Sequence, residues 1–337
     1  MTLQNIKLWN GKMVPRIGIG TWVMGGEQFA DGMPLGWSNV DDKTSVRTLH
    51  TAFDLGVRII DTSNQYGGGH SEEVIARGIA ESALSRDDLV ICTKAGMVCD
   101  PVSGDLTGTT VDKAEITASI EGSLRRLKTD HLDLVKFHLN RHPAAESEEV
   151  FEAFSDAYKA GKIGGFGWSN DNLEGALAFA DLDGYVAVQH DLNLFSPADD
   201  VLRGLEAQGL WAFNRQPLAM GLLSGKYTLD SPKADSNDVR TSGMSWLRYF
   251  TAEGAPTAEL VDAVDRVRDL LTQDGRTVAQ GALGWCLAQS ERAIPLPGCR
   301  TPEQAIDNFG VLALPAMKTT IVEEIGKLVF DLQRPTA

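Results

Sequence analysis

The sequence predicts an α/β fold, a (β/α)8 barrel of the TIM type that residues 1–337 form as a single domain. Eight short apolar runs alternate with segments in which apolar residues recur every three or four positions, the pattern of strands each followed by a helix. A chain of 337 residues has the length of eight such units. No run of Pro, Ser, Gly or like charges long enough to be a linker interrupts the first 215 residues, which favours one domain over two.

The expected strands and helices alternate along the chain. Strands are expected at residues 17–20, 58–60, 89–92, 132–135, 163–166, 186–188, 210–213 and 292–295. Helices are expected between and after them, at residues 46–55, 72–80, 114–127, 150–160, 173–180, 201–207, 258–271 and 302–309. A further helix, at residues 319–332, is expected to pack outside the barrel or across its bottom.

Two segments lie outside this alternation. Asn10-Gly11 between apolar residues is typical of a tight turn, so we expect an N-terminal β-hairpin that serves as a lid or plug. The connection from Gln216 to Pro256, after the seventh strand, is far longer than an ordinary strand-to-helix loop. It holds an aromatic cluster at residues 246–250, so we expect it to cover a binding site.

A doubly wound dinucleotide-binding sheet is the main rival architecture. It should carry the pattern G-x-G-x-x-G between its first strand and first helix. Residues 18–23 (GIGTWV) and 165–170 (GFGWSN) both lack the third glycine. The barrel is therefore preferred.

Composition excludes several classes of function. Lys and Arg number 31 against 46 Asp and Glu, and a net charge of -15 repels nucleic acid, so no nucleic-acid partner is expected. No stretch approaches the roughly 20 apolar residues of a membrane span, and the N-terminus lacks signal-peptide features, so we expect a cytoplasmic protein without membrane contact. The four cysteines show no C-x-x-C spacing, and Pro143 follows directly after the pair His138 and His142 with no third ligand apparent, so no metal site is expected.

Four residues at the expected strand ends carry the chemistry. The active site of such a barrel lies at the carboxyl ends of the strands, where Asp61, Lys94 and His138 occur, with Tyr66 five residues after Asp61. A lysine beside a tyrosine lowers the pKa of the phenol, and a carboxylate keeps that lysine charged and oriented. Tyr66 can then act as a general acid while His138 polarises a carbonyl oxygen. Taken singly, each has a structural alternative: a helix cap, a salt bridge, a pocket wall or a core histidine.

Several motifs resemble the signature blocks of the aldo-keto reductase superfamily. They are DTSNQYGGGHSE at residues 61–72, Thr93-Lys94, Phe137-His138 and GWSN at residues 167–170, and the likeness extends from residues 18–21 to residues 294–301 and Asn308. The chain is similar to bacterial members related to the branch of the potassium-channel β subunits. The resemblance implies a catalytic tetrad of Asp61, Tyr66, Lys94 and His138, in which Tyr66 donates a proton while a nicotinamide delivers hydride to an aldehyde or ketone, reversibly.

The resemblance also implies a cofactor cleft. Its expected members are Trp22, Ser169, Asn170, Gln189, Arg215, Gln216, Pro217, Leu218, Gly221, Leu223, Gly225, Lys226, Gly298, Arg300, Gln304, Asp307 and Asn308. Thr301 as N-cap and Pro302 as first helical residue predict a helix N-terminus suited to a phosphate. Arg300 is the best candidate for a 2′-phosphate, so NADP(H) is expected, although Gln304 stands where many members carry arginine and NAD(H) stays an alternative.

The substrate pocket is expected between Trp22, Asn140, Trp168, Trp246 and Phe250. Arg215 occupies the place where many members stack a tyrosine on the nicotinamide, and its guanidinium plane can stack similarly. Two alternatives stay open: a cofactor-binding regulatory subunit with little turnover, and a barrel aldolase in which Lys94 forms a Schiff base. The sequence identifies neither the carbonyl or alcohol substrate, nor the direction of the reaction, nor the oligomeric state.

Overall fold

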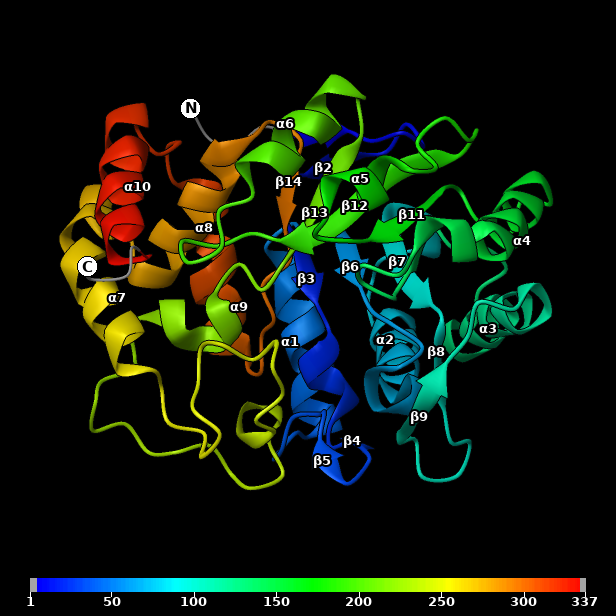
Figure 1. Cartoon of the computed structure of the whole chain (residues 1–337), viewed down its shortest axis with the longest axis horizontal. Helices are drawn as coiled ribbons and strands as arrows, with labels where there is room; N and C mark the ends of the chain where they lie inside the picture. The colour runs from blue at the N-terminus through cyan, green and yellow to red at the C-terminus, as the bar shows by residue number, and fades with distance from the viewer. Residues whose placement is uncertain (1–4, 334–337) are drawn as a thin grey trace.

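Eight parallel strands form the centre of the molecule in this computed structural model, which describes residues 5–333. The strands pair in chain order: β3 (Gly18–Gly20), β6 (Ile59–Asp61), β7 (Val90–Ala95), β10 (Leu134–Phe137), β11 (Phe166–Ser169), β12 (Tyr185–Asp191), β13 (Trp211–Arg215) and β14 (Ala293–Pro295). A parallel bridge between Gly20 and Gly298 brings the two ends of the sheet together. The predicted TIM barrel is confirmed (Figure 1).

Helices cover the outside of this barrel. They are α1 (Asp42–Asp54), α2 (His70–Ala80), α3 (Lys113–Leu127), α4 (Glu148–Lys159), α5 (Leu173–Leu177), α6 (Asp199–Ala207), α7 (Ala258–Leu271), α8 (Val278–Gln289), α9 (Pro302–Phe309) and α10 (Thr319–Gln333). The C-terminal α10 packs on α7 and α8, outside the barrel as expected (Figure 1). Among residues 5–333, no helix is long and apolar enough to cross a membrane.

Side-chain caps fix where several helices begin. Asp41 accepts a hydrogen bond from the Thr44 amide, and Asp112 accepts one from the Glu115 amide, so each begins a helix with a satisfied N-H group. Thr301 caps α9 in the same way, with Pro302 in the first turn. The predicted helix start at Thr301 is therefore confirmed.

The N-terminal hairpin closes the amino end of the barrel. Strands β1 (Asn5–Lys7) and β2 (Met13–Pro15) pair antiparallel, and Gly11 supplies the positive φ of +83° that the turn requires. Leu8 and Val14 are buried against the first residues of the barrel strands, including Ile59 and Leu134. The hairpin is thus a plug, one of the two roles expected for it.

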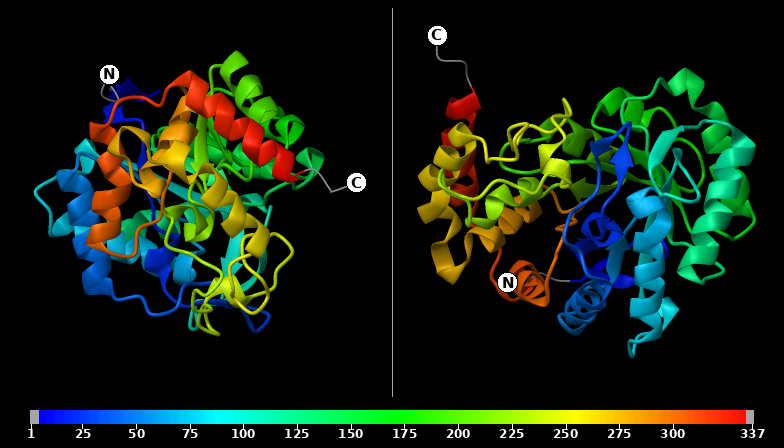
Figure 2. Two further views of the ribbon diagram at one scale, coloured as in Figure 1. Left: turned by 90° about the vertical axis from the view of Figure 1, so that its left-hand side faces the viewer. Right: turned by 90° about the horizontal axis from the view of Figure 1, so that it is seen from below.

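The carboxyl end of the barrel carries the mouth. A four-stranded sheet of β4 (Phe29–Ala30), β5 (Met33–Pro34), β8 (Met97–Cys99) and β9 (Leu106–Thr109) lies at this end, together with the long connection after β13 (Figures 1 and 2). This connection contains two short 3-10 turns, at Ala219–Ser224 and Val239–Thr241, and an isolated antiparallel bridge between Phe250 and Pro256. Its Val239 amide donates to the Gly36 carbonyl at 2.7 Å, so the loop is tied to the opposite rim of the mouth.

Candidate active site

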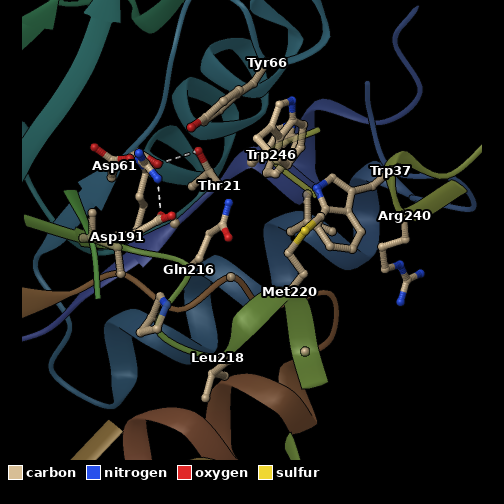
Figure 3. A pocket seen from close by; sticks show the side chains of 18 of the residues that line it. Thr21, Trp37, Asp61, Tyr66, Asp191, Gln216, Leu218, Met220, Arg240 and Trp246 are labelled. Carbon is tan, nitrogen blue, oxygen red and sulfur yellow. Dashed lines mark hydrogen bonds and ion pairs between the residues drawn. The ribbon is translucent and has the colours of Figure 1, made fainter. Parts of the chain in front are cut away.

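A cavity of about 730 Å³ opens at the carboxyl ends of the barrel strands. Its wall joins two regions of different chemistry. The lining includes Asp61, Tyr66 and His138 as well as the basic residues Lys226, Arg240 and Arg300. In Figure 3, Asp61 and Arg240 lie on opposite sides of the cavity. The wall between them is rich in aromatic and apolar side chains. The cavity is therefore long enough to bring a reactive group to one end and an anionic group to the other.

Tyr66 is positioned by the glycines around it. It begins a short 3-10 turn after β6, in which Gly67 and Gly68 both have φ of +62°. A Cβ atom on Gly67 would lie 2.1 Å from the Gly25 carbonyl oxygen, so only glycine fits at this close approach. The Tyr66 ring stacks on Trp22, with centroids 6.1 Å apart. The Tyr66 backbone is thus held where its hydroxyl meets the end of β7.

Lys94 links Tyr66 to Asp61. Its Nζ donates to Asp61 Oδ2 at 2.7 Å, to the Thr62 carbonyl at 2.7 Å and to Tyr66 Oη at 3.1 Å. The lysine is 1% exposed. With three acceptors around it and no open face, Lys94 is placed to orient Tyr66, and this geometry disfavours a Schiff-base nucleophile.

Asp61 also binds a second lysine, Lys136 of β10. The Lys136 ammonium contacts Asp61 Oδ1, and Gln189 Nε2 donates to Asp61 Oδ2 at 3.1 Å. Burial alone would raise the pKa of Asp61, but Lys136 and Lys94 outweigh it and lower the pKa to about 2. Asp61 is therefore ionised throughout the physiological range.

The electrostatics of Tyr66 differ from the sequence-based expectation. Burial and the negative charge of Asp61 raise the pKa of Tyr66, and the positive charges of Lys136 and Arg215 oppose this only in part. The expected lowering of its pKa by Lys94 is thus wrong for this structure, because desolvation of the phenolate is the larger effect. Tyr66 is held as a phenol, the form that can donate a proton.

His138 is a neutral imidazole beside this group. Burial and the nearby Lys94 charge lower the pKa of His138 well below its usual range. Its Nδ1 lies 3.1 Å from Ser63 Oγ, and its ring meets the Tyr66 ring edge-on with centroids 6.1 Å apart. Tyr66 and His138 therefore border the same corner of the cavity, and the structure brings the four expected tetrad residues together.

Arg215, at the end of β13, is clamped by two carboxylates. Its Nη2 lies 2.6 Å from Asp171 Oδ2, its Nη1 contacts Asp191, and all three side chains line the cavity. Asn140 Nδ2 donates to Asp171 at 2.7 Å. This network fixes the guanidinium plane at the position expected to face the nicotinamide.

Several buried polar atoms of the cavity residues have no hydrogen-bond partner among residues 5–333. They are Trp22 Nε1, Trp37 Nε1, Gln189 Oε1 and Arg300 Nε. Such groups cost free energy unless something binds to them. Gln189 Oε1 fits an amide N-H, and Arg300 Nε fits an anion, so this wall matches a ligand with a carboxamide and phosphates.

The segment after β13 has an unusual backbone. Gln216, Ala219 and Met220 adopt positive φ of +55°, +48° and +55°, which is rare for residues other than glycine. Gln216 and Met220 line the cavity, as does Gly221. Clustered backbone strain is typical of ligand-binding segments, so this one is shaped for the cavity rather than for the core.

A basic region marks the far end of the cavity. Arg300 and Arg240 both lie over the Trp37 ring, at 5.9 and 5.1 Å from its centroid, and Lys226 is close enough for their charges to lower its pKa in addition to the effect of burial. Gln304, near the start of α9, accepts a hydrogen bond from the Arg300 amide at 2.8 Å. A basic cluster beside a helix N-terminus suits a phosphate, although the chain as a whole is strongly acidic.

Most of the expected cofactor and pocket residues line the cavity. These are Trp22, Asn140, Ser169, Gln189, Arg215, Gln216, Pro217, Leu218, Gly221, Lys226, Trp246, Gly298, Arg300, Gln304, Asp307 and Asn308. Asn170, Leu223 and Gly225 lie outside the lining. Asn170 is buried beside α5, where its Oδ1 accepts from the Asn172 amide, and a Cβ atom on Gly225 would lie 2.8 Å from Val278 of α8. The structure does not bring these three residues to the cavity surface.

Two expected pocket walls are placed differently by the structure. Trp168 alternates with Ser169 along β11, and since Ser169 faces the cavity, Trp168 faces outward. It is fully buried, 5.5 Å from the Phe151 ring of α4. Phe250 packs on Tyr227 inside the long loop, with centroids 5.4 Å apart. Both serve as core packing and do not line the cavity.

The sequence reasoning gave no role to Lys136, Asp171, Asp191, Trp37 or Arg240, all of which belong to this site or touch it. Lys136 had a detectable signal, because a lysine inside an apolar strand and two residues before His138 must share the barrel-facing side with it. Asp191 is the last residue of β12, and the others lie in the connections between barrel strands and helices, where spacing alone indicates little.

Comparisons with known proteins show the family of this chain. The model of the aldo/keto reductase family matches residues 16–328. The aldo-keto reductase YhdN of Bacillus subtilis is 31% identical over 295 residues, covering 86% of this chain and 82% of that protein. The chain belongs to the aldo/keto reductase family. The resemblance read from the motifs is confirmed, and the chain is an NAD(P)H-dependent oxidoreductase.

Solved structures show the same fold. The glycerol dehydrogenase AKR11B4 of Gluconobacter oxydans superposes with a TM-score of 0.79 at 26% identity, over 100% of this chain and 97% of that one. An aldo-keto reductase of Klebsiella pneumoniae, solved in complex with NADPH, has a TM-score of 0.68 at 24% identity, over 100% and 98%. This chain therefore shares their barrel along its whole length.

Proposed function

We propose that this protein is an NADP(H)-dependent reductase of small aldehydes or ketones in which Tyr66 is the general acid, and that the same residues run the reverse oxidation. The observation that carries the proposal is the hydrogen-bonded chain from Asp61 through Lys94 to Tyr66 at one end of the cavity. Its support from relatives is the family membership and the NADPH complex of the Klebsiella enzyme.

The cavity residues fit the cofactor. Gln189 Oε1, without a partner among the described residues, would hold the carboxamide together with Ser169, and Arg300 and Lys226 would hold the phosphates. The clamped Arg215 guanidinium would lie against the nicotinamide ring. When bound, the reduced nicotinamide supplies the hydride that this chain lacks. Arg300 is the residue we propose for the 2′-phosphate, which would favour NADP(H) over NAD(H).

The tetrad residues divide the remaining work. In the tautomer protonated on Nε2, His138 Nδ1 would accept a hydrogen bond from Ser63 Oγ, 3.1 Å away, and the neutral imidazole would donate its Nε2 proton to a substrate carbonyl oxygen. Tyr66 Oη-H then protonates the same oxygen as negative charge develops on it. Lys94 keeps the phenol oriented, and the ionised Asp61 keeps Lys94 in place. Each role follows from a contact within this chain.

The first test is titration of the purified protein with NADPH and with NADH, followed by quenching of tryptophan fluorescence. A panel of aldehydes is then added while the absorbance of the reduced nicotinamide is recorded. We expect tighter binding of NADPH and measurable turnover, which would also separate a reductase from a purely regulatory subunit. Failure to bind either cofactor would contradict the proposal.

The second test assigns the acid. Tyr66→Phe removes the donated proton and should lower kcat by at least about a hundredfold while NADPH still binds. Tyr185→Phe is the matched control, because Tyr185 is a buried tyrosine whose hydroxyl donates to the Ala176 carbonyl outside the cavity. Equal activity of the Tyr66 variant and the control would exclude Tyr66 as the proton donor.

A further inference from the structure

Lys136 is a second fully buried lysine in the barrel, and the tetrad does not explain it. It lies on β10 opposite Lys94 of β7 in the strand register, and its side chain is 0% exposed. His138 follows two residues later, so both side chains project from the same face of the chain. Lys136 is therefore built into the barrel interior beside the proton donor.

The contacts of Lys136 give the site two ammonium groups for one carboxylate. Its Nζ contacts Asp61 Oδ1 and lies 5.0 Å from the centre of the Phe213 ring. Asp61 Oδ2 already binds Lys94 at 2.7 Å. One lysine is enough to neutralise Asp61, so the group of Asp61, Lys94 and Lys136 carries a net positive charge, and Lys94 of this group contacts Tyr66. Burying such a charge lowers the free energy of unfolding. An apolar residue at position 136 would avoid this loss, which indicates that the lysine has a function.

The charged and titratable groups around Tyr66 are Asp61 from β6, Lys94 from β7, Lys136 from β10 with His138 just beyond it, and Arg215 from β13. Asp61 favours the protonated phenol, whereas Lys136 and Arg215 favour the phenolate. Arg215 is paired with Asp171 and Asp191, so much of its charge is offset locally. Lys136 shares Asp61 with Lys94, so the two lysines carry one positive charge more than this carboxylate offsets.

We propose that Lys136 is a positioning residue for proton transfer: it takes one oxygen of Asp61 and adds the positive charge that allows the Tyr66 phenolate to form. The inference rests on the proposed function of Tyr66. During reduction the carbonyl carbon accepts a hydride, with its electron pair, from the reduced nicotinamide, and the carbonyl oxygen takes the proton of Tyr66. The products are an alcohol, the oxidised cofactor and a phenolate, which regains a proton from water.

The test is the pH dependence of kcat in both directions for Lys136→Met. Alcohol oxidation needs the Tyr66 phenolate as base, so kcat for oxidation rises with pH as the phenolate forms. Removing one nearby positive charge should move this rising limb of the pH profile to higher pH by about one unit. At a fixed pH below this rising limb, kcat for oxidation by the variant should be about tenfold lower than that of the parent enzyme, because the phenolate population changes tenfold per pH unit. Carbonyl reduction also leaves Tyr66 as a phenolate, so its rate should fall too, whereas the affinity for NADPH, measured by fluorescence, should stay within about twofold.

Three further variants separate charge from packing. Lys136→Arg keeps the charge and should return the limb toward that of the parent enzyme. Phe213→Leu disturbs the packing under Lys136 without changing any charge, so it should lower stability and leave the limb in place. Lys136→Gln is the neutral replacement to use if the methionine variant does not fold.

An unshifted limb in a folded neutral variant would overturn the inference and leave Lys136 as a structural counter-ion. Failure of every neutral variant to fold would overturn it too, because the lysine would then serve the fold. Failure of the proposed function looks different: the parent enzyme would show no turnover, or turnover that survives Tyr66→Phe. The two outcomes are therefore distinguishable.

Discussion

Replacing Arg215 by methionine should destabilise the protein in a pH-dependent way. The change removes the guanidinium that contacts both Asp171 and Asp191, whose side chains are 21% and 16% exposed. Each lost charge-assisted hydrogen bond is worth about 1.5–3 kcal/mol. Part of this is recovered by retained partners, since Asn140 still donates to Asp171 and Arg248 lies 3.7 Å from Asp191. We expect a net loss of about 3 kcal/mol at pH 8.

The sign of the pH dependence follows from the two carboxyl groups. Burial raises the pKa of Asp191 although Arg215 is present. At Asp171, burial is outweighed by Arg215 together with hydrogen bonds from the Asp191 amide and Asn140, so its pKa is lowered. Without Arg215, both folded-state pKa values should lie above their unfolded values, so the native state is penalised where the groups are ionised. The loss should therefore be largest at pH 8 and shrink as the pH falls toward 5.

The assay is urea unfolding at pH 5 and pH 8, with a thermal scan as a second measurement. For 337 residues an unfolding entropy of about 2 cal/mol/K per residue converts 3 kcal/mol into about 4 °C in Tm. Arg203→Met is the matched control, because its pair with Asp200 is exposed and should contribute less than about 1 kcal/mol. A loss below about 1 kcal/mol at pH 8, or an equal loss at both pH values, would refute the reasoning.

Two further predictions concern the frame of the site. Arg126→Leu should cost about 3 kcal/mol in urea unfolding, because it leaves the fully buried Glu72 without its ion pair at 2.7 Å; an unchanged midpoint would contradict this. Gly167→Ala should abolish folding or lower Tm sharply, since its Cβ would lie 1.7 Å from the Ala187 carbonyl oxygen. Gly108→Ala, which meets nothing within 4 Å, is the control and should unfold like the parent protein.

The barrel strands were predictable because each is a short apolar run followed by a polar strand end. The fifth strand shows the limit of that reasoning. It is expected at residues 163–166 but spans Phe166–Ser169, because the preceding Gly164 and Gly165 lie where other chain atoms approach closely. A Cβ atom on Gly165 would lie 2.9 Å from Trp9 Nε1 of the N-terminal plug. Such a contact between distant segments leaves no trace in the local pattern.

Helix α8 was missed for a different reason. Its sequence VAQGALGWCLAQ has almost no polar face, since the helix is buried between the barrel and its neighbours α7 and α9. Periodicity reveals a helix only when one side faces water. The four-stranded sheet at the mouth was missed because its strands are two to four residues long, too short to show alternation.

The tetrad could be named from spacing, since Asp61, Lys94 and His138 all follow apolar runs whose carboxyl ends must meet. The direction in which the pKa of Tyr66 shifts could not be predicted, because it depends on how deeply the phenol is buried in the folded chain. The predicted pocket role of Trp168 was wrong for a related reason. Ser169 faces the cavity, and because neighbouring residues of a strand face opposite sides, Trp168 is buried in the core outside the barrel strands.

The hairpin covers the amino end of the barrel, whereas the cavity opens at the carboxyl end. Leu8 and Val14 pack on the amino ends of the strands, and Tyr66 borders the cavity beside the 216–256 connection, so we expect ligands to reach Tyr66 through this opening. Both ligands would use this opening, and a dinucleotide bound along the strand ends would have to bind before the carbonyl compound or alcohol reaches Tyr66. We therefore expect the alcohol or carbonyl compound to bind last and dissociate first. Excess product should then slow the dissociation of the dinucleotide.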